Sequence, residues 1–145
     1  MARNVRRMSC EPESVFGVLA DGWLYPAWVV GASRMRQVDA SWPQQGAKLH
    51  HSVGTWPALL NDSTSVEVWD PPRRAVLRAR GWPIGEARVT LEVKPVAGGC
   101  VVRIEEEAVN GPAALLPRFL ADPVLQWRNT ETLRRLAYLA ENGAR

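Results

Sequence analysis

Two residues capable of acid–base chemistry stand at positions where a sheet would face inward. His51 lies between Leu49 and Val53 in an alternating segment, and the alternation places all three side chains on one face. An inward histidine can act as a general base or donate a hydrogen bond to the carbonyl or carboxylate of a ligand. The alternative is a core histidine bonded to a backbone carbonyl or to Tyr25, and the sequence leaves both open.

Glu106 is a carboxylate on an otherwise apolar strand face. Val102 and Ile104 face inward on the last predicted strand, and the same register puts Glu106 inside. Burial would raise the pKa of Glu106 and suit it to general acid–base catalysis or to ligand binding. The competing interpretation is that the strand bulges or ends within its three consecutive glutamates, which leaves Glu106 in solvent. Even a pair of His51 and Glu106 lacks the nucleophile of a hydrolytic triad.

Asn129 interrupts the apolar stripe of the last predicted helix, with Thr132 and Leu133 beside it. A buried amide needs hydrogen-bond partners. Asn129 can bond a ligand in a cavity, or it can tie the helix to the sheet or to His51. In an enzyme, Asn129 or His51 would polarise a carbonyl while Glu106 acted as acid or base.

Aromatic and aliphatic side chains could line the same cavity. Alternation with charged residues points Leu77, Val89 and Leu91 inward. Tyr25 and Trp28 belong to an apolar segment that would close the cavity. Seven tryptophans are many for 145 residues, and their flat faces suit aromatic ligands, although plain packing at the sheet rim is the alternative. Six of them lie in the helix-turn region, near turns or at strand ends: Trp23, Trp28, Trp42, Trp56, Trp69 and Trp82. For Trp69, the alternation predicts the outer face.

The spacing of apolar residues predicts the elements that position these side chains. A period of two, with turn residues between the segments, predicts a strand at each of 3–8, 34–39, 47–55, 62–69, 74–80, 85–94 and 100–109. Short turns between successive strands imply an antiparallel sheet.

Helices are expected early in the chain and at its end. Residues 11–20 show helical spacing, and residues 23–30 fit a short second helix or turn. Asp122 and Pro123 read as an N-cap followed by a first helical residue, and Gly143 stands where a C′ residue belongs. The most economical packing of this order is one α+β domain spanning 1–145, in which a curved antiparallel sheet wraps the long helix.

Composition and charge exclude several classes of protein. Hydrophobic residues make up 46% and charged residues 23%, as in globular chains, and we expect no stable membrane insertion because the longest apolar run is too short. The net charge of +3 comes from scattered arginines, so nucleic acid is not an expected partner. Two lone cysteines without metal-site spacing, and no secretion signal, predict a cytoplasmic protein with reduced thiols, no metal and no cofactor.

The order of elements resembles the helix-grip fold of the START-like, or SRPBCC, superfamily. The resemblance covers essentially the whole chain and is most specific in residues 66–78, where a strand enters an Asp-Pro-Pro turn and returns, as in the polyketide-cyclase-like branch. Residues 28–32, 49–54, 81–83 and 127–136 are similar to small bacterial members of unassigned role. The resemblance implies a deep cavity between helix and sheet for a hydrophobic or amphipathic ligand, and it implies no reaction.

Three functions remain open at this point. The first is a binding protein for a small hydrophobic molecule, a lipid or an aromatic metabolite. The second is an enzyme of the cyclase or dehydratase kind, with His51, Glu106 and Asn129 as its candidate residues. The third is a module that binds another protein, or a homodimer, through an apolar patch around Trp127 and Tyr138 on the outer face of the last helix.

Overall fold

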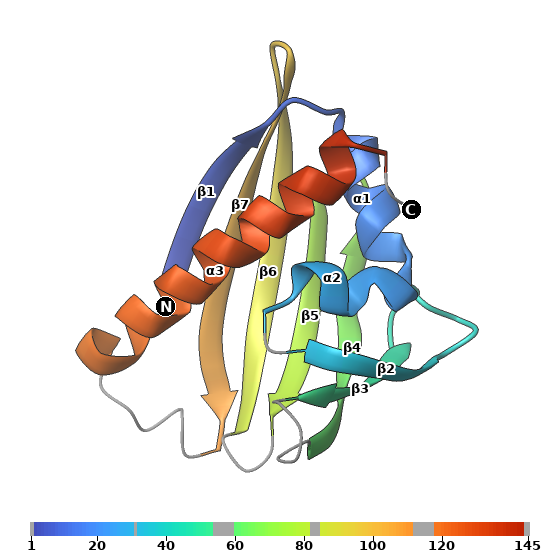
Figure 1. Ribbon diagram of the computed structural model, residues 1–145, viewed down its shortest axis with the longest axis vertical. Coiled ribbons are helices and arrows are strands. Elements are labelled where there is room, and N and C mark those ends of the chain that lie inside the picture. The colour runs from blue at the N-terminus through green and yellow to red at the C-terminus, as the bar shows by residue number, and fades with distance from the viewer. Residues whose placement is uncertain (1, 31, 54–59, 82–84, 112–117, 144–145) are drawn as a thin grey trace.

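A single antiparallel sheet and one long helix dominate the structure (Figure 1). The computed structural model describes residues 2–30, 32–53, 60–81, 85–111 and 118–143. The seven strands lie in the order β1-β7-β6-β5-β4-β3-β2. Their bounds are β1 (Ala2–Met8), β2 (Ala32–Val38), β3 (Lys48–Val53), β4 (Leu60–Asp70), β5 (Arg74–Gly81), β6 (Gly85–Val96) and β7 (Gly99–Asn110). All seven predicted strands are therefore confirmed. From β2 to β7 each strand pairs with the next one along the chain, and β1 pairs with β7.

The pairing of β6 with β7 decides how Glu106 is oriented. Val89 of β6 lies directly opposite Glu106, and the ladder continues without a register shift from Ala87 through to Val96. A regular ladder preserves the alternation of side chains, so Glu106 shares the inner face with Ile104. The strand neither bulges nor ends at the three glutamates.

A β-bulge in β4 overturns the expectation for Trp69. Val66 pairs with Leu77 but Val68 pairs with Val76, so one extra residue is inserted in β4 between them. The insertion reverses the alternation after Val66 and brings Trp69 to the inner face. There its ring meets the Phe16 ring edge-on, with ring centroids 5.3 Å apart. The prediction of an outward Trp69 was wrong because strict alternation does not survive a bulge.

Three short helical segments follow β1. They are α1 (Pro12–Ala20), the 3-10 turn η1 (Gly22–Leu24) and α2 (Tyr25–Trp28). Pro12 and Pro26 each occupy a first turn, where the missing N–H costs nothing. The carboxylate of Asp21 accepts a hydrogen bond from the backbone N–H of Trp23 and thereby caps η1. Both α1 and α2 contact the long helix.

The long helix α3 (Arg118–Glu141) starts earlier than the sequence predicted. Asp122 is not its N-cap, because Pro123 lies inside the helix, at its sixth position. A proline so near the start deprives only one carbonyl of its partner, so the helix tolerates it. Gly143, two residues after the end of the helix, has a φ of 70°, as expected for a C′ residue.

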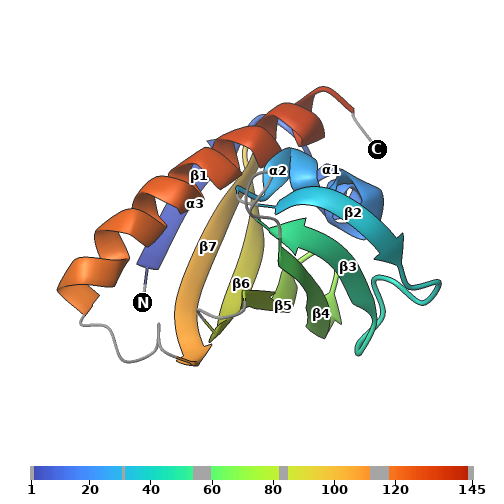
Figure 2. The same cartoon turned by 60° about the horizontal axis from the view of Figure 1, so that its bottom comes forward.

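The concave face of the sheet and α3 enclose the hydrophobic core. Figure 2 shows α3 lying along the open side of the curved sheet, with α2 beside it. Asn4 of β1 donates a hydrogen bond of 2.9 Å to the hydroxyl of Thr130, and Glu141 accepts two from Ser9, so the middle and the C-terminal end of α3 are tied to the start of the chain. Fully buried residues on the two surfaces include Leu49, Leu91, Val102, Ile104, Leu133 and Leu136.

Candidate functional site

The first buried polar group joins α2 to strands β3 and β4. The Tyr25 hydroxyl and the His51 Nε2 each lie 2.9 Å from the Oγ1 of Thr64. All three side chains are buried, and the Tyr25 and His51 rings pack with centroids 5.2 Å apart. His51 is on the inner face, as the alternation predicted, and Tyr25 is its neighbour through Thr64.

Thr64 has one hydroxyl proton, so it can donate to only one of its two neighbours. If it donates to His51, it accepts from Tyr25. If His51 donates to it and Thr64 in turn donates to Tyr25, the Tyr25 proton is free for another acceptor. Burial lowers the pKa of His51 and raises the pKa of Tyr25 to about 12. Both groups are therefore neutral near pH 7 and act as hydrogen-bonding groups rather than charges.

The second buried polar group joins β7 to α3. The carboxylate of Glu106, 3% exposed, accepts hydrogen bonds of 2.9 and 3.2 Å from the Nη2 of Arg128. The amide of Asn129, 1% exposed, lies beside the same carboxylate, although its Nδ2 forms no hydrogen bond of standard geometry with any described residue. Glu106 and Asn129 thus meet at one place, and Arg128 completes the group.

Burial and the charge of Arg128 shift the pKa of Glu106 in opposite directions. Burial raises the pKa of Glu106 and is the largest influence, while the positive charge of Arg128 and the amide of Asn129 lower it by less. The net effect is a raised pKa, because removing a carboxylate from water disfavours its charged form. A carboxyl of this kind can exchange a proton nearer to neutral pH than an ordinary glutamate.

Tyr25 is hydrogen-bonded within the first group and also lies within electrostatic range of the second. Arg128 and Glu106 are both close enough to act electrostatically on the Tyr25 hydroxyl. The charges that act on the pKa of His51 are instead those of Asp62, Arg36 and His50. The structure therefore brings Glu106 and Asn129 together, whereas His51 bonds Thr64 in the other group.

The apolar residues proposed for ligand binding surround these groups. Trp28 packs edge-on against Tyr25, with ring centroids 5.4 Å apart, and is 3% exposed. Buried residues of the same inner surface are Leu77, Leu91, Thr132 and Leu133, and Val89 is half-buried. Trp56 and Trp82, proposed for the cavity rim, lie outside the described residues.

Two residues of the site, Thr64 and Arg128, were not predicted from the sequence. Thr64 stands two positions before the inward Val66, so alternation along β4 could have placed it inside. Arg128 precedes Asn129 on α3, and a buried carboxylate at Glu106 requires a cation within reach.

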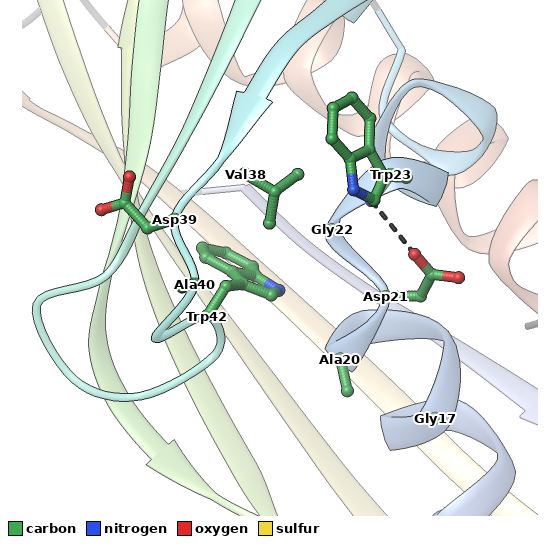
Figure 3. Close-up of a pocket in the computed structure, with 9 residues that line it drawn as sticks. All are labelled: Gly17, Ala20, Asp21, Gly22, Trp23, Val38, Asp39, Ala40 and Trp42. Atoms are coloured by element: carbon green, nitrogen blue, oxygen red, sulfur yellow. Dashed lines mark hydrogen bonds between the residues drawn. The ribbon is translucent and has the colours of Figure 1, made fainter.

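A separate depression of about 500 Å³ lies on the surface, between the end of α1 and the segment that follows β2 (Figure 3). It is lined by Gly17, Ala20, Asp21, Gly22, Trp23, Val38, Asp39, Ala40 and Trp42. None of the residues proposed for ligand binding borders it. Two of the tryptophans proposed for a cavity rim, Trp23 and Trp42, therefore belong to this outer depression.

The residues that the structure describes contain neither a metal cluster nor a helix that could span a membrane. No group of three or more His, Cys, Asp or Glu side chains there could hold a metal ion. None of the described helices is both long and apolar enough to cross a bilayer.

One family model matches nearly the whole chain. The model of the family described as "Polyketide cyclase / dehydrase and lipid transport" matches residues 2–141. The chain belongs to this family. Its resemblance to the START-like superfamily is thereby confirmed. Among curated proteins, no sequence match was found.

Solved structures share the fold at low identity. Protein NE0264 from Nitrosomonas europaea is 16% identical with a TM-score of 0.73, covering 97% of this chain and 94% of that one. Ara h 8.0201 is 11% identical with a TM-score of 0.70, covering 95% of each chain. The di-domain ARO/CYC StfQ from the steffimycin biosynthetic pathway is 15% identical with a TM-score of 0.69, covering 98% of this chain and 50% of that one. The architecture is accordingly the helix-grip fold.

Proposed function

We propose that this protein binds a small hydrophobic or amphipathic molecule between the inner face of the sheet and α3. The observation that carries the proposal is the composition of that inner surface. Buried polar side chains, His51, Glu106 and Asn129, stand among apolar and aromatic ones rather than in a purely apolar core. Ligand sites have this character, because apolar walls supply affinity and a few polar groups fix orientation.

Membership of a family whose description includes lipid transport supports the same proposal. A lipid or an aromatic, polyketide-like metabolite is the class of ligand that such walls would accept, with Tyr25 and Trp28 stacking against its rings.

A cyclase or dehydratase activity is the second candidate, because Glu106 and Asn129 meet at one place. Such a reaction needs a shaped pocket, one acid–base group and a donor that polarises a carbonyl. The raised pKa of Glu106 suits it to be the acid–base group, and the Asn129 amide can be the donor that polarises the carbonyl. Arg128 already occupies both oxygens of Glu106, which favours binding over proton transfer.

The test is saturable binding of a neutral apolar fluorophore, N-phenyl-1-naphthylamine, to the purified protein. We expect one binding event per chain with micromolar affinity, together with quenching of tryptophan fluorescence. Native mass spectrometry of protein purified without denaturation would identify any molecule that it retains. The absence of saturable binding in both measurements would contradict the proposal.

Two matched leucine substitutions on α3 locate the bound fluorophore. Leu133→Phe adds volume at the buried inner surface and is expected to weaken binding at least about tenfold. Leu139→Phe makes the same change at a partly buried position of the same helix and is expected to retain binding. Melting temperatures of both variants separate lost binding from lost folding. Equal weakening in both variants would place the fluorophore elsewhere.

A further inference from the structure

Two buried hydrogen-bond donors on α3 form no hydrogen bond of standard geometry with the described residues, although one of them, the Asn129 amide, lies beside the Glu106 carboxylate and lowers its pKa. They are the Nε of Arg128 and the Nδ2 of Asn129. Asn129 is 1% exposed, so water does not reach its amide freely. Buried polar atoms are nearly always paired in proteins, and each exception calls for an explanation.

The unused Nε of Arg128 contrasts with another arginine on the same helix. Arg134 donates from both Nε and Nη2 to the two carboxylate oxygens of Glu131, which is the usual forked arrangement. Arg128 presents only its Nη2 to both oxygens of Glu106, and its Nε is left over. The Arg128–Glu106 pair thus satisfies the carboxylate and leaves the buried Nε of the guanidinium without a partner of standard geometry.

Both available donors lie next to the same carboxylate, on consecutive residues of one helix. The Tyr25 hydroxyl on the neighbouring α2 is close enough to feel the charges of Arg128 and Glu106. Arginine and amide N–H groups can only donate, so what complements them is an acceptor oxygen. The charges of Arg128 and Glu106 balance, and a second carboxylate here would stand beside the first. A neutral acceptor is therefore favoured over an anion.

We propose that Arg128 Nε and Asn129 Nδ2 receive the carbonyl oxygen of a neutral ketone, quinone or lactone whose apolar skeleton lies against the inner surface. This inference rests on the proposed binding function and adds the chemical class of the ligand. The polar end of the ligand lies at the middle of α3, beside Glu106, and its rings lie toward Trp28 and Leu133.

The experiment compares three probes that share one skeleton and differ at one substituent. They are 2-acetylnaphthalene, its hydrocarbon counterpart 2-ethylnaphthalene, and the anion 2-naphthoate. Each is titrated against protein carrying N-phenyl-1-naphthylamine, and the concentration that displaces half of the fluorophore is measured. In the wild-type protein we expect the ketone to bind about tenfold or more tightly than the hydrocarbon, as for a hydrogen bond to a charged donor. We expect the anion to bind more weakly than the ketone.

Variants assign that preference to the two donors. Arg128→Lys retains a positive charge near Glu106 but lacks the Nε donor, and Asn129→Leu is nearly the same size without the amide. Each is expected to reduce the preference for the ketone to about threefold or less while the hydrocarbon binds as before. Arg134→Lys, on the exposed part of α3, is the matched control and retains the full preference. Glu106→Gln leaves Arg128 without its counter-charge and is expected to reverse the order in favour of the anion.

The outcomes separate this inference from the proposed function. If the wild-type protein binds ketone and hydrocarbon equally, the donors do not read a carbonyl, and the inference is overturned while ligand binding stands. If the anion binds most tightly to the wild-type protein, the neutral class is wrong. If no probe displaces the fluorophore and the fluorophore itself does not bind, both proposals fall. The comparison in the wild-type protein needs no variant to fold.

Discussion

Replacing Arg128 with methionine should destabilise the protein in a way that depends on pH. The substitution retains an apolar stem of similar length and removes the positive charge that faces Glu106. Glu106 is 3% exposed, so without Arg128 its carboxylate has neither a counter-charge nor full hydration. The folded protein would then have to keep Glu106 protonated or bury a charge, and each option costs free energy of folding.

The magnitude follows from the exposure of the two partners. Removing one partner of a fully buried ion pair costs about 3–5 kcal/mol. The Arg128 side chain is 34% exposed, so solvent already screens part of the attraction, and we expect a loss of about 2 kcal/mol at pH 8. This loss includes the hydrogen bonds of 2.9 and 3.2 Å that Glu106 accepts.

The direction of the pH dependence follows from the raised pKa of Glu106. In the unfolded chain this carboxyl titrates near 4.5, in the folded wild type above that value, and in Arg128→Met higher still, because the main influence that lowers the pKa is gone. As pH falls below 4.5 the carboxyl becomes mostly protonated in every state, so the variant loses less than about 1 kcal/mol. Above the wild-type value the variant holds a proton that the wild type has released, so its relative stability falls as pH rises.

Urea denaturation followed by circular dichroism from pH 4 to pH 8 measures these differences. Glu106→Gln in the same background removes the unpaired charge and should recover most of the loss at pH 8. A loss that is equal at pH 4 and pH 8, or that Glu106→Gln does not recover, would refute the reasoning. The first result would assign the role of Arg128 to packing alone.

Three further predictions concern the elements that hold the site in place. Gly99→Ala should destabilise the protein by about 2 kcal/mol, because the new Cβ would collide with a backbone carbonyl of β1. The Cβ of Gly17→Ala in α1 meets nothing within 4 Å, so this substitution should stabilise the protein by roughly 0.5–1 kcal/mol. Urea denaturation measures both changes. A double-mutant cycle of Phe16→Ala and Trp69→Ala should give a coupling of about 1 kcal/mol, and zero coupling would return Trp69 to the outer face. NMR titration of His51 should give a midpoint below 6.5, since burial lowers its pKa. Its contribution to stability is then lost as pH falls below 6.5, and a midpoint at or above 6.5 would contradict the dominance of burial.

Most of the fold could be predicted from sequence because alternation and turn residues are local signals. The seven strands appear within a few residues of their expected bounds, and the inward positions of His51 and Glu106 follow from simple alternation. Trp69 was misplaced because the bulge in β4 depends on pairing with β5, which a single strand does not reveal. The start of α3 was misplaced because the Asp122-Pro123 pair has a strong local preference for a helix start that the rest of the helix overrides.

The site was harder to predict than the fold, since its groups combine across distant segments. Alternation shows that Glu106 faces inward, but it does not show that Arg128 lies opposite. Likewise, the link from His51 to Tyr25 runs through Thr64, whose position depends on how α2 packs over β3 and β4. Such partners become visible only when the curvature of the sheet and the placement of α3 are known.

The most direct test of the account is to locate a bound neutral probe by NMR. Side-chain methyl and indole N–H signals are recorded while N-phenyl-1-naphthylamine is added to the labelled protein. If the ligand lies between the sheet and α3, the largest shifts will occur at Trp28, Leu91 and Leu133. Shifts confined to Trp23 and Trp42, which line the surface depression in Figure 3, or no shifts at all, would contradict the account.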